Sequence, residues 1–145
     1  MAKTTDAADD VARIRRSWAR AASAGDIVGT LFYNRLFEIA PETRTLFAAD
    51  LDRQAGKLMQ TLNWIVDHVD APDALLPRAA ALAERHVRYG VTPAQYPLVG
   101  QALVDTLAGA LGAGFDAADA AAWGRVYGAL SGAMIAHAYP AGADQ

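Results

Sequence analysis

Apolar residues recur at intervals of three and four along almost the whole chain, and no stretch alternates with period two for long enough to predict a strand. This periodicity predicts an all-α protein of six or seven helices joined by short turns, with no internal repeat. A chain of 145 residues is long enough for one substantial hydrophobic core. We therefore expect a single domain over residues 1–145, with short flexible ends at about 1–6 and 140–145.

Capping residues, glycines and prolines indicate the helix boundaries. The first helix, at about residues 7–24, should bury the face that carries Val11, Ile14, Trp18 and Ala21, with Arg13, Arg15, Arg16 and Arg20 forming a solvated face. Asp26 is the expected N-cap of a second helix over residues 27–40, which is apolar on nearly every side and should be buried between others. The remaining helices are expected from Pro41, over 51–69, from Pro77 to Gly90, after Thr92-Pro-Ala-Gln95, and from Asp116 to Pro140, with a corner at 48–50.

Two local features carry further expectations. Pro97 should cost its helix a hydrogen bond in an early turn. Gly124, Gly128 and Gly132, spaced by four, should let another helix approach closely in the core.

Composition removes several classes of function. A net charge of -3 gives no broad positive field for nucleic acid or for an anionic membrane. The absence of cysteine excludes disulfides, iron–sulfur clusters, thiolate-bound zinc and a cysteine nucleophile. Acidic residues stand where a signal peptide needs an apolar run, and the longest weakly polar run, at 126–139, is too short to span a bilayer. We therefore expect a cytoplasmic protein.

His86 is the residue that most needs a chemical explanation. It shares an apolar helix face with Leu75, Leu76, Ala79, Leu82 and Ala83. One interpretation is a core histidine whose nitrogens are satisfied by nearby backbone, and the other is a metal ligand. His68 and His137 do not lie three or four residues from His86 or from each other, so no two-histidine zinc motif is present. A single histidine without a second protein ligand suits a cofactor with its own equatorial ligands, of which haem is the common case.

Six runs, in order, resemble those of bacterial single-domain globins: Leu31-Phe-Tyr-Asn-Arg-Leu-Phe37, Pro41-Glu-Thr-Arg-Thr-Leu-Phe47, Gln54-Ala-Gly-Lys-Leu-Met-Gln60, His86-Val-Arg-Tyr-Gly-Val91, Tyr96-Pro-Leu-Val-Gly-Gln101 and Ala122-Trp-Gly-Arg-Val-Tyr-Gly128. The likeness is to the lineage of Vitreoscilla haemoglobin and the flavohaemoglobins, and is greatest to the Hell's Gate type of globin. It covers the chain from about Val11 to Tyr139. It implies a three-over-three globin sandwich that holds haem b (iron protoporphyrin IX) between the helix over 51–69 and the His86 helix.

The resemblance also implies roles for individual residues. His86 corresponds to the proximal iron ligand, with the Leu82 carbonyl as the acceptor of its second ring nitrogen. Tyr33 and Gln54 correspond to the distal polar residues that hold dioxygen, and Leu58 to the apolar residue above the iron. Lys57 is either a partner of a haem propionate or a free surface lysine. Phe47 corresponds to the phenylalanine that packs on the haem, and the remaining candidates to line the pocket are Val91, Tyr96, Val99, Leu103 and Met134.

One position departs from the flavohaemoglobin pattern. Tyr96 matches the tyrosine that assists the proximal histidine, but Ala138 stands where the pattern has a glutamate. A carboxylate there would raise the electron-donating power of the histidine, so strongly activated oxygen chemistry is less favoured without it.

These residues favour reversible dioxygen binding, for storage or delivery, over catalysis. CO and NO are further expected ligands. The alternative is a nitric oxide dioxygenase, which would need a separate reductase because the chain ends soon after the last expected helix. A haem-based gas sensor and a plain helical interaction domain are weaker alternatives. The expected assembly is a monomer or a weak homodimer.

Overall fold

Helices make up nearly all of the ordered chain. The computed structural model describes residues 2–47 and 50–139, with side chains from Ala8 onward. The α-helices are α1 (Ala2–Ala22), α2 (Ile27–Ile39), α3 (Leu51–Asp67), α4 (Pro72–Tyr89), α5 (Tyr96–Leu111) and α6 (Ala117–Ala138). Three 3₁₀ segments join them: η1 (Pro41–Leu46), η2 (Pro93–Gln95) and η3 (Gly112–Gly114). The described ranges contain no strand, so the predicted all-α class is confirmed.

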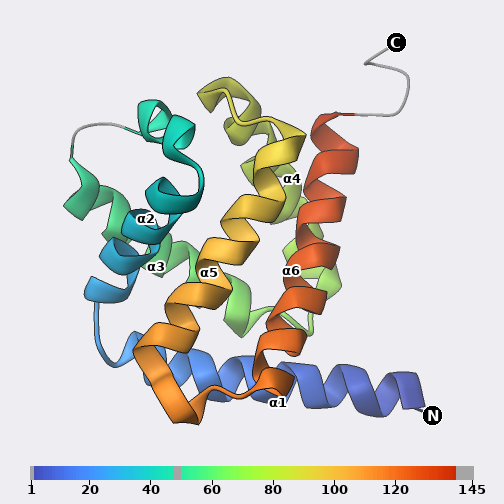
Figure 1. Ribbon diagram of the computed structural model, residues 1–145. Helices are drawn as coiled ribbons and strands as arrows, with labels where there is room; N and C mark the ends of the chain where they lie inside the picture. The colour runs from blue at the N-terminus through green and yellow to red at the C-terminus, as the bar shows by residue number, and fades with distance from the viewer. Residues whose placement is uncertain (1, 48–49, 140–145) are drawn as a thin grey trace.

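The α-helices form two layers of three. Helices α2, α5 and α6 form one layer, in which α2 packs on α5 and α5 runs side by side with α6 in the opposite direction (Figure 1). Helices α3 and α4 lie behind this layer, and α1 crosses below and contacts α3, α5 and α6. Between the layers α3 packs on α2 and α4 packs on α6, whereas α3 and α4 make little direct contact with each other. This arrangement confirms the three-over-three sandwich and separates the two helices expected to enclose a cofactor.

Most predicted helix ends are confirmed. Gly90 ends α4 with a left-handed φ of 92°, a conformation that glycine adopts without strain. At the start of α6, Asp116 accepts a hydrogen bond from the Asp119 backbone, and the Asp119 side chain returns one to the Asp116 backbone. Before α5, the Gln95 side chain accepts from the Thr92 backbone N–H. Asp26 occupies the N-cap position of α2, but its side chain makes no capping hydrogen bond.

The predictions for Pro77 and Pro97 were wrong. Helix α4 begins at Pro72, where the missing N–H costs nothing, and continues through Pro77. Helix α5 begins at Tyr96, so Pro97 lies in the first turn, where backbone N–H groups have no intrahelical partner. Pro97 therefore does not cost the expected hydrogen bond. The first helix also begins earlier than predicted, at Ala2. Ala48, Ala49 and residues 140–145, where a corner and a flexible end were expected, lie outside the described residues.

The core confirms the inward face of α1. Ile14, Trp18 and Ala21 are buried and join the main hydrophobic cluster, whose largest fully enclosed side chains include Leu36 and Leu107. A second cluster lies between α4 and α6 and is built on Ala79, Ala83, Tyr96 and Met134. Helix α2 is less enclosed than predicted, because Ile27 is 59% exposed and Leu31 is 43% exposed.

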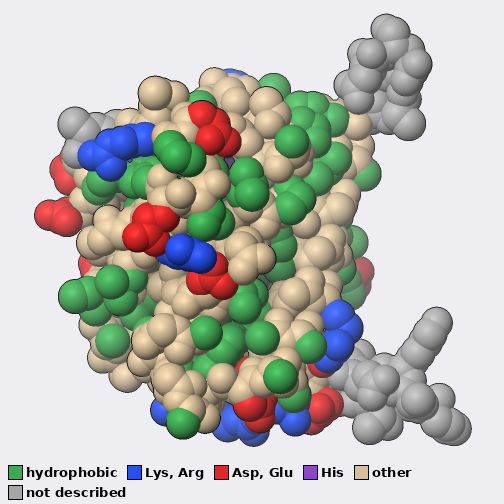
Figure 2. All heavy atoms as spheres, in the orientation of Figure 1, with side chains coloured by type: hydrophobic (Ala, Val, Ile, Leu, Met, Phe, Trp, Pro, Cys, Tyr) green, Lys and Arg blue, Asp and Glu red, His purple; other side chains and the backbone are tan. Residues whose placement is uncertain are grey.

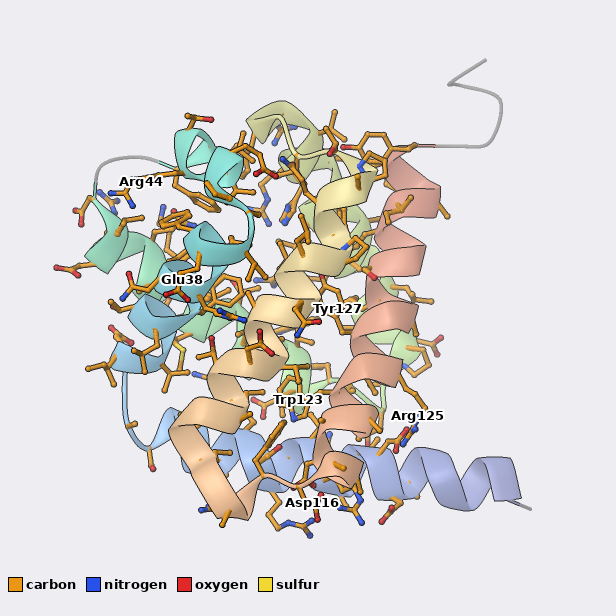
Figure 3. The ribbon with its side chains drawn as sticks, viewed as in Figure 1. Glu38, Arg44, Asp116, Trp123, Arg125 and Tyr127 are labelled. Atoms are coloured by element: carbon orange, nitrogen blue, oxygen red, sulfur yellow. The ribbon has the colours of Figure 1, made fainter. Side chains whose placement is uncertain are left out.

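The arginines of α1 do not form a simple solvated face. Arg15 reaches Asp70 at 2.8 Å and two carbonyls at the end of α3, and Arg20 donates to the Gly114 carbonyl at 3.1 Å. Arg13 and Arg16 pair with the buried Asp119 at 3.1 and 3.8 Å. These side chains tie α1 to both layers, and Figure 3 shows Asp116 beside α1 at the start of α6.

The glycines that allow close helix approach are not those predicted. A Cβ at Gly29 would lie 2.9 Å from the Ala55 Cβ, and one at Gly100 would lie 2.6 Å from the Tyr127 ring. A Cβ at Gly124, Gly128 or Gly132 would meet nothing within 4 Å, so these three glycines face open space rather than another helix. Periodicity shows that residues share a side of a helix but not which side is covered. None of the helices in the described ranges is long and apolar enough to cross a membrane.

Candidate cofactor and ligand site

Helix α4 holds the His86 ring by a backbone contact one turn earlier. His86 Nδ1 donates to the Leu82 carbonyl at 2.7 Å, because a carbonyl oxygen can only accept. This bond leaves the lone pair of Nε2 available, and Nε2 has no partner among the described residues. Burial lowers the pKa of His86, the hydrogen bond to Leu82 opposes the shift, and the nearby Arg85 charge adds to it. The ring is therefore a neutral nitrogen donor, as a metal ligand must be.

Two tyrosines flank the His86 ring. The Tyr96 ring centroid lies 6.0 Å away with an interplanar angle of 29°, and that of the exposed Tyr89 lies 6.4 Å away. Tyr96 is 3% exposed, and its hydroxyl has no hydrogen-bond partner among the described residues. Burial, with a smaller effect from Tyr139, raises the pKa of Tyr96 to about 12. The phenol is therefore protonated at neutral pH, with neither its proton nor its lone pairs engaged.

The surroundings of Tyr96 contain no carboxylate where the resemblance would place one. Ala138 packs against the same cluster, and the neighbouring Tyr139 donates to the Val91 carbonyl. His137 turns instead toward Glu84 of α4, with 2.7 Å between its Nε2 and a carboxylate oxygen. The proximal histidine candidate thus has a neutral carbonyl as its only hydrogen-bond partner in the described part of the chain.

Tyr33 of α2 and Gln54 of α3 form a second group of predicted site residues, separate from the cluster around Tyr96 and Met134. The Gln54 amide donates to the Tyr33 hydroxyl oxygen at 3.2 Å. The Tyr33 proton itself has no acceptor among the described residues, although Tyr33 is 4% exposed and burial raises its pKa. The pair therefore offers a free O–H donor in a dry environment.

Aromatic packing and a close helix crossing position this pair. The Tyr33 ring makes edge contacts with Phe32 and Phe47 at 5.0 and 4.9 Å between centroids. One turn before Tyr33, Gly29 allows the backbone of α2 to lie against Ala55, the residue after Gln54. The roles of Phe32 and Gly29 were not predicted, because a glycine and a phenylalanine in an apolar helix carry no local sign of a long-range partner.

The other predicted lining residues divide between the two clusters. Phe47, Leu58, Val99 and Leu103 belong to or pack against the main cluster with Tyr33, whereas Leu82, Val91, Tyr96 and Met134 belong to or pack against the second cluster, between α4 and α6. Lys57 is exposed and has no ion pair in the described ranges. The three histidines lie apart, with His68 stacked on Trp64 at 4.1 Å, and the described residues contain no group of three metal-binding side chains.

The residues between α3 and α4 fit a flat apolar cofactor with one protein ligand. Leu58, Leu62 and Ile65 of α3 and His86 of α4 are only half-buried, although the first three are strongly apolar. A planar apolar group between the helices would cover these half-buried side chains. A metal ion at its centre could bind the free lone pair of His86 Nε2. A separate groove of about 530 Å³ lies between α2 and α5 and contains none of the predicted site residues. Figure 2 views that face, where acidic and basic side chains lie among hydrophobic ones.

Comparisons with known proteins agree with this geometry. A family model described as Globin matches residues 30–134. A flavohemoprotein of Deinococcus radiodurans is 34% identical over 128 residues, which are 83% of this chain and 32% of the relative. Flavohemoproteins of Chromobacterium violaceum and Rhodopirellula baltica are 34% and 29% identical over 72% and 63% of this chain, and 26% and 23% of their own lengths. The chain therefore spans about a third or less of these relatives. The family match and the two-layer all-α fold agree, and the chain therefore belongs to the globin family.

Proposed function

We propose that this chain is a globin domain that binds haem b and uses it to bind dioxygen reversibly, for storage or delivery. The observation that carries the proposal is a pair of side-chain groups without protein partners, one on the half-buried His86 and one on the buried Tyr33. His86 Nε2 has a free lone pair, and the Tyr33 hydroxyl, which accepts from Gln54, has a free proton.

The described residues fit haem b between α3 and α4. His86 would ligate the iron, Phe47 and Leu58 would pack on the ring, and Lys57 would reach a propionate. Bound haem would supply an iron centre that takes up diatomic ligands, which a protein side chain cannot supply. The chain contributes a neutral imidazole, apolar walls that exclude water and the two distal donors.

Tyr33 and Gln54 would stabilise a diatomic ligand that carries partial negative charge. Tyr33 donates through its O–H, and Gln54 holds the phenol by donating to its oxygen at 3.2 Å. A hydrogen bond to a charged group contributes about 1.5–3 kcal/mol, and more in a dry pocket than in water. Dioxygen should therefore bind tightly and leave slowly.

The proximal side supports binding over catalysis. His86 donates to a neutral carbonyl, and the Tyr96 hydroxyl has no partner among the described residues. Nitric oxide dioxygenation with a separate reductase remains the alternative, and multiple-turnover consumption of NO with an added reductase tests it. Sustained consumption of NO would favour a nitric oxide dioxygenase over a dioxygen-storage protein.

The absorption spectrum of the purified protein tests the proposal directly. The ferric, ferrous and CO-bound forms should show haem bands, and His86→Ala should lose them or the normal ferrous spectrum. His68→Ala and His137→Ala are matched controls, because these histidines engage Trp64 and Glu84 outside the site. A colourless wild-type protein that does not take up haem would refute the proposal.

A further inference from the structure

Most of the described basic side chains fall into two groups, and only Arg20, which donates to the Gly114 carbonyl, belongs to neither. Arg13, Arg15, Arg16, Arg35 and Arg125 all form ion pairs. Every arginine and lysine between Pro41 and Tyr89 is exposed, and none forms an ion pair with another described residue. These cations are Arg44, Arg53, Lys57, Arg78, Arg85 and Arg88. The cations without ion pairs are thus concentrated on the elements that enclose the proposed haem site.

Four of them lie on α3 and α4, the two helices proposed to enclose haem. Arg53 and Lys57 are four residues apart on α3, and Arg78 and Arg85 are seven apart on α4, so each pair shares one side of its helix. Trp64, seven residues after Lys57, lies under the Arg78 guanidinium at 4.7 Å, which brings the two helix sides together. We call Arg53, Lys57, Arg78 and Arg85 the cationic rim.

The cationic rim adjoins the proposed haem site on both helices. Lys57 lies three residues after Gln54, and Arg85 directly precedes His86. Two acids of the same helices lie away from these cations, because Glu84 binds His137 of α6 and Asp52 lies roughly 140° around the α3 axis from Lys57. Asp50, the N-cap of α3, shares the side of Arg53 and Lys57, but its carboxylate accepts from the Arg53 backbone. None of the four rim cations forms an ion pair with a described acid.

Haem propionates would neutralise only part of this charge. Haem b carries two propionates, whereas the cationic rim carries four positive charges, which leaves two in excess. The chain as a whole has a net charge of -3, so the residues outside the cationic rim sum to -7. Such a charge distribution favours the approach of an anionic partner at the cationic rim. The neighbouring Tyr89, 59% exposed, adds an apolar contact beside Arg85.

We propose that the cationic rim is the docking surface for an acidic electron-donor protein that reduces the haem. The inference rests on the proposed function, because only ferrous haem binds dioxygen. In the step itself the donor, a reduced flavoprotein or iron–sulfur protein, loses one electron and ferric iron becomes ferrous, with no covalent bond made or broken. A protein partner is favoured over an anionic membrane, because a broad anionic surface would repel the remaining negative charge.

Stopped-flow reduction of the ferric holoprotein by flavodoxin hydroquinone, an acidic one-electron donor, tests the proposal. We compare wild type with Arg53→Gln/Arg85→Gln, which lowers the net charge by two. The matched control is Ala121→Glu/Ala129→Glu, which makes the same change on exposed positions of α6. At low salt the rim variant should be reduced about tenfold more slowly than wild type, with the control within about twofold, and salt should remove the difference.

Three outcomes would overturn the proposal. The rim variant could be reduced as fast as wild type, the α6 control could lose as much rate as the rim variant, or the wild-type rate could be insensitive to salt. Co-sedimentation with phosphatidylglycerol vesicles that depends on Arg53 and Arg85, without an effect on reduction, would assign the cationic rim to a membrane instead. Each variant is first checked for haem bands and for full reduction by dithionite. Absence of haem would refute the proposed function rather than the docking surface.

Discussion

The sharpest test of the distal site is Tyr33→Phe. The substitution removes one hydroxyl and keeps the ring, so the edge contacts of residue 33 with Phe32 and Phe47, at 5.0 and 4.9 Å, are retained. Gln54 loses its acceptor but is only half-buried and can turn to water. We therefore expect little change in the free energy of unfolding and a specific loss of ligand stabilisation.

The magnitude follows from the hydrogen bond that is removed. A bond to a charged acceptor contributes about 1.5–3 kcal/mol, and each 1.4 kcal/mol is about tenfold in rate or affinity. Dioxygen should therefore leave Tyr33→Phe about 10- to 100-fold faster than wild type. Stopped-flow displacement of dioxygen by CO measures this rate.

Tyr127→Phe is the matched control. It also removes a phenol hydroxyl, from a half-buried tyrosine, but that hydroxyl donates to the Tyr96 carbonyl at 2.6 Å, between α5 and α6 (Figure 3). Its dioxygen off-rate should equal that of wild type. An off-rate for Tyr33→Phe within about twofold of wild type, with an intact haem spectrum, would show that Tyr33 does not hold the ligand.

Three further predictions concern stability. Gly29→Ala should destabilise the protein by about 1–3 kcal/mol, because the new Cβ would lie 2.9 Å from that of Ala55, whereas Gly124→Ala, with nothing within 4 Å, should stabilise it by up to about 1 kcal/mol in urea unfolding. Tyr96→Phe should leave the stability of the haem-free protein unchanged or raise it, since the hydroxyl is buried without a partner; a clear loss would reveal an unseen acceptor. Hydrogen bonds from Arg125 of α6 are the main cause of the lowered pKa of Asp10. The ionised Asp10 therefore stabilises the fold above pH 3.8, and this stabilisation is lost as the pH falls below that value. Asp10→Asn should therefore be less stable at pH 7 and lose less on acidification, as measured by thermal unfolding across pH.

Several features of this protein were predictable from the sequence because they depend on neighbours within one or two helical turns. Apolar periodicity identified the helices, and Gly90, Thr92 and Asp116 marked ends that the structure confirms. The bond from His86 to Leu82 spans four residues, so the helix itself brings the two groups together. The globin resemblance added the distal residues, and the structure joins Tyr33 to Gln54 across 21 residues of sequence.

Tertiary structure alone decided which side of each element is covered. The sequence could not show that Gly29 rather than Gly124 lies at a helix crossing, because both are glycines in apolar helices. It could not show that Arg13 and Arg15 of α1 find acids 106 and 55 residues away, while Arg53 and Arg85 find none in the described ranges. It could not show that the Tyr96 hydroxyl is left without a partner. Local sequence determines helices by contacts of three and four residues, but burial, pairing and unpaired charge depend on helices that meet only when the chain has folded.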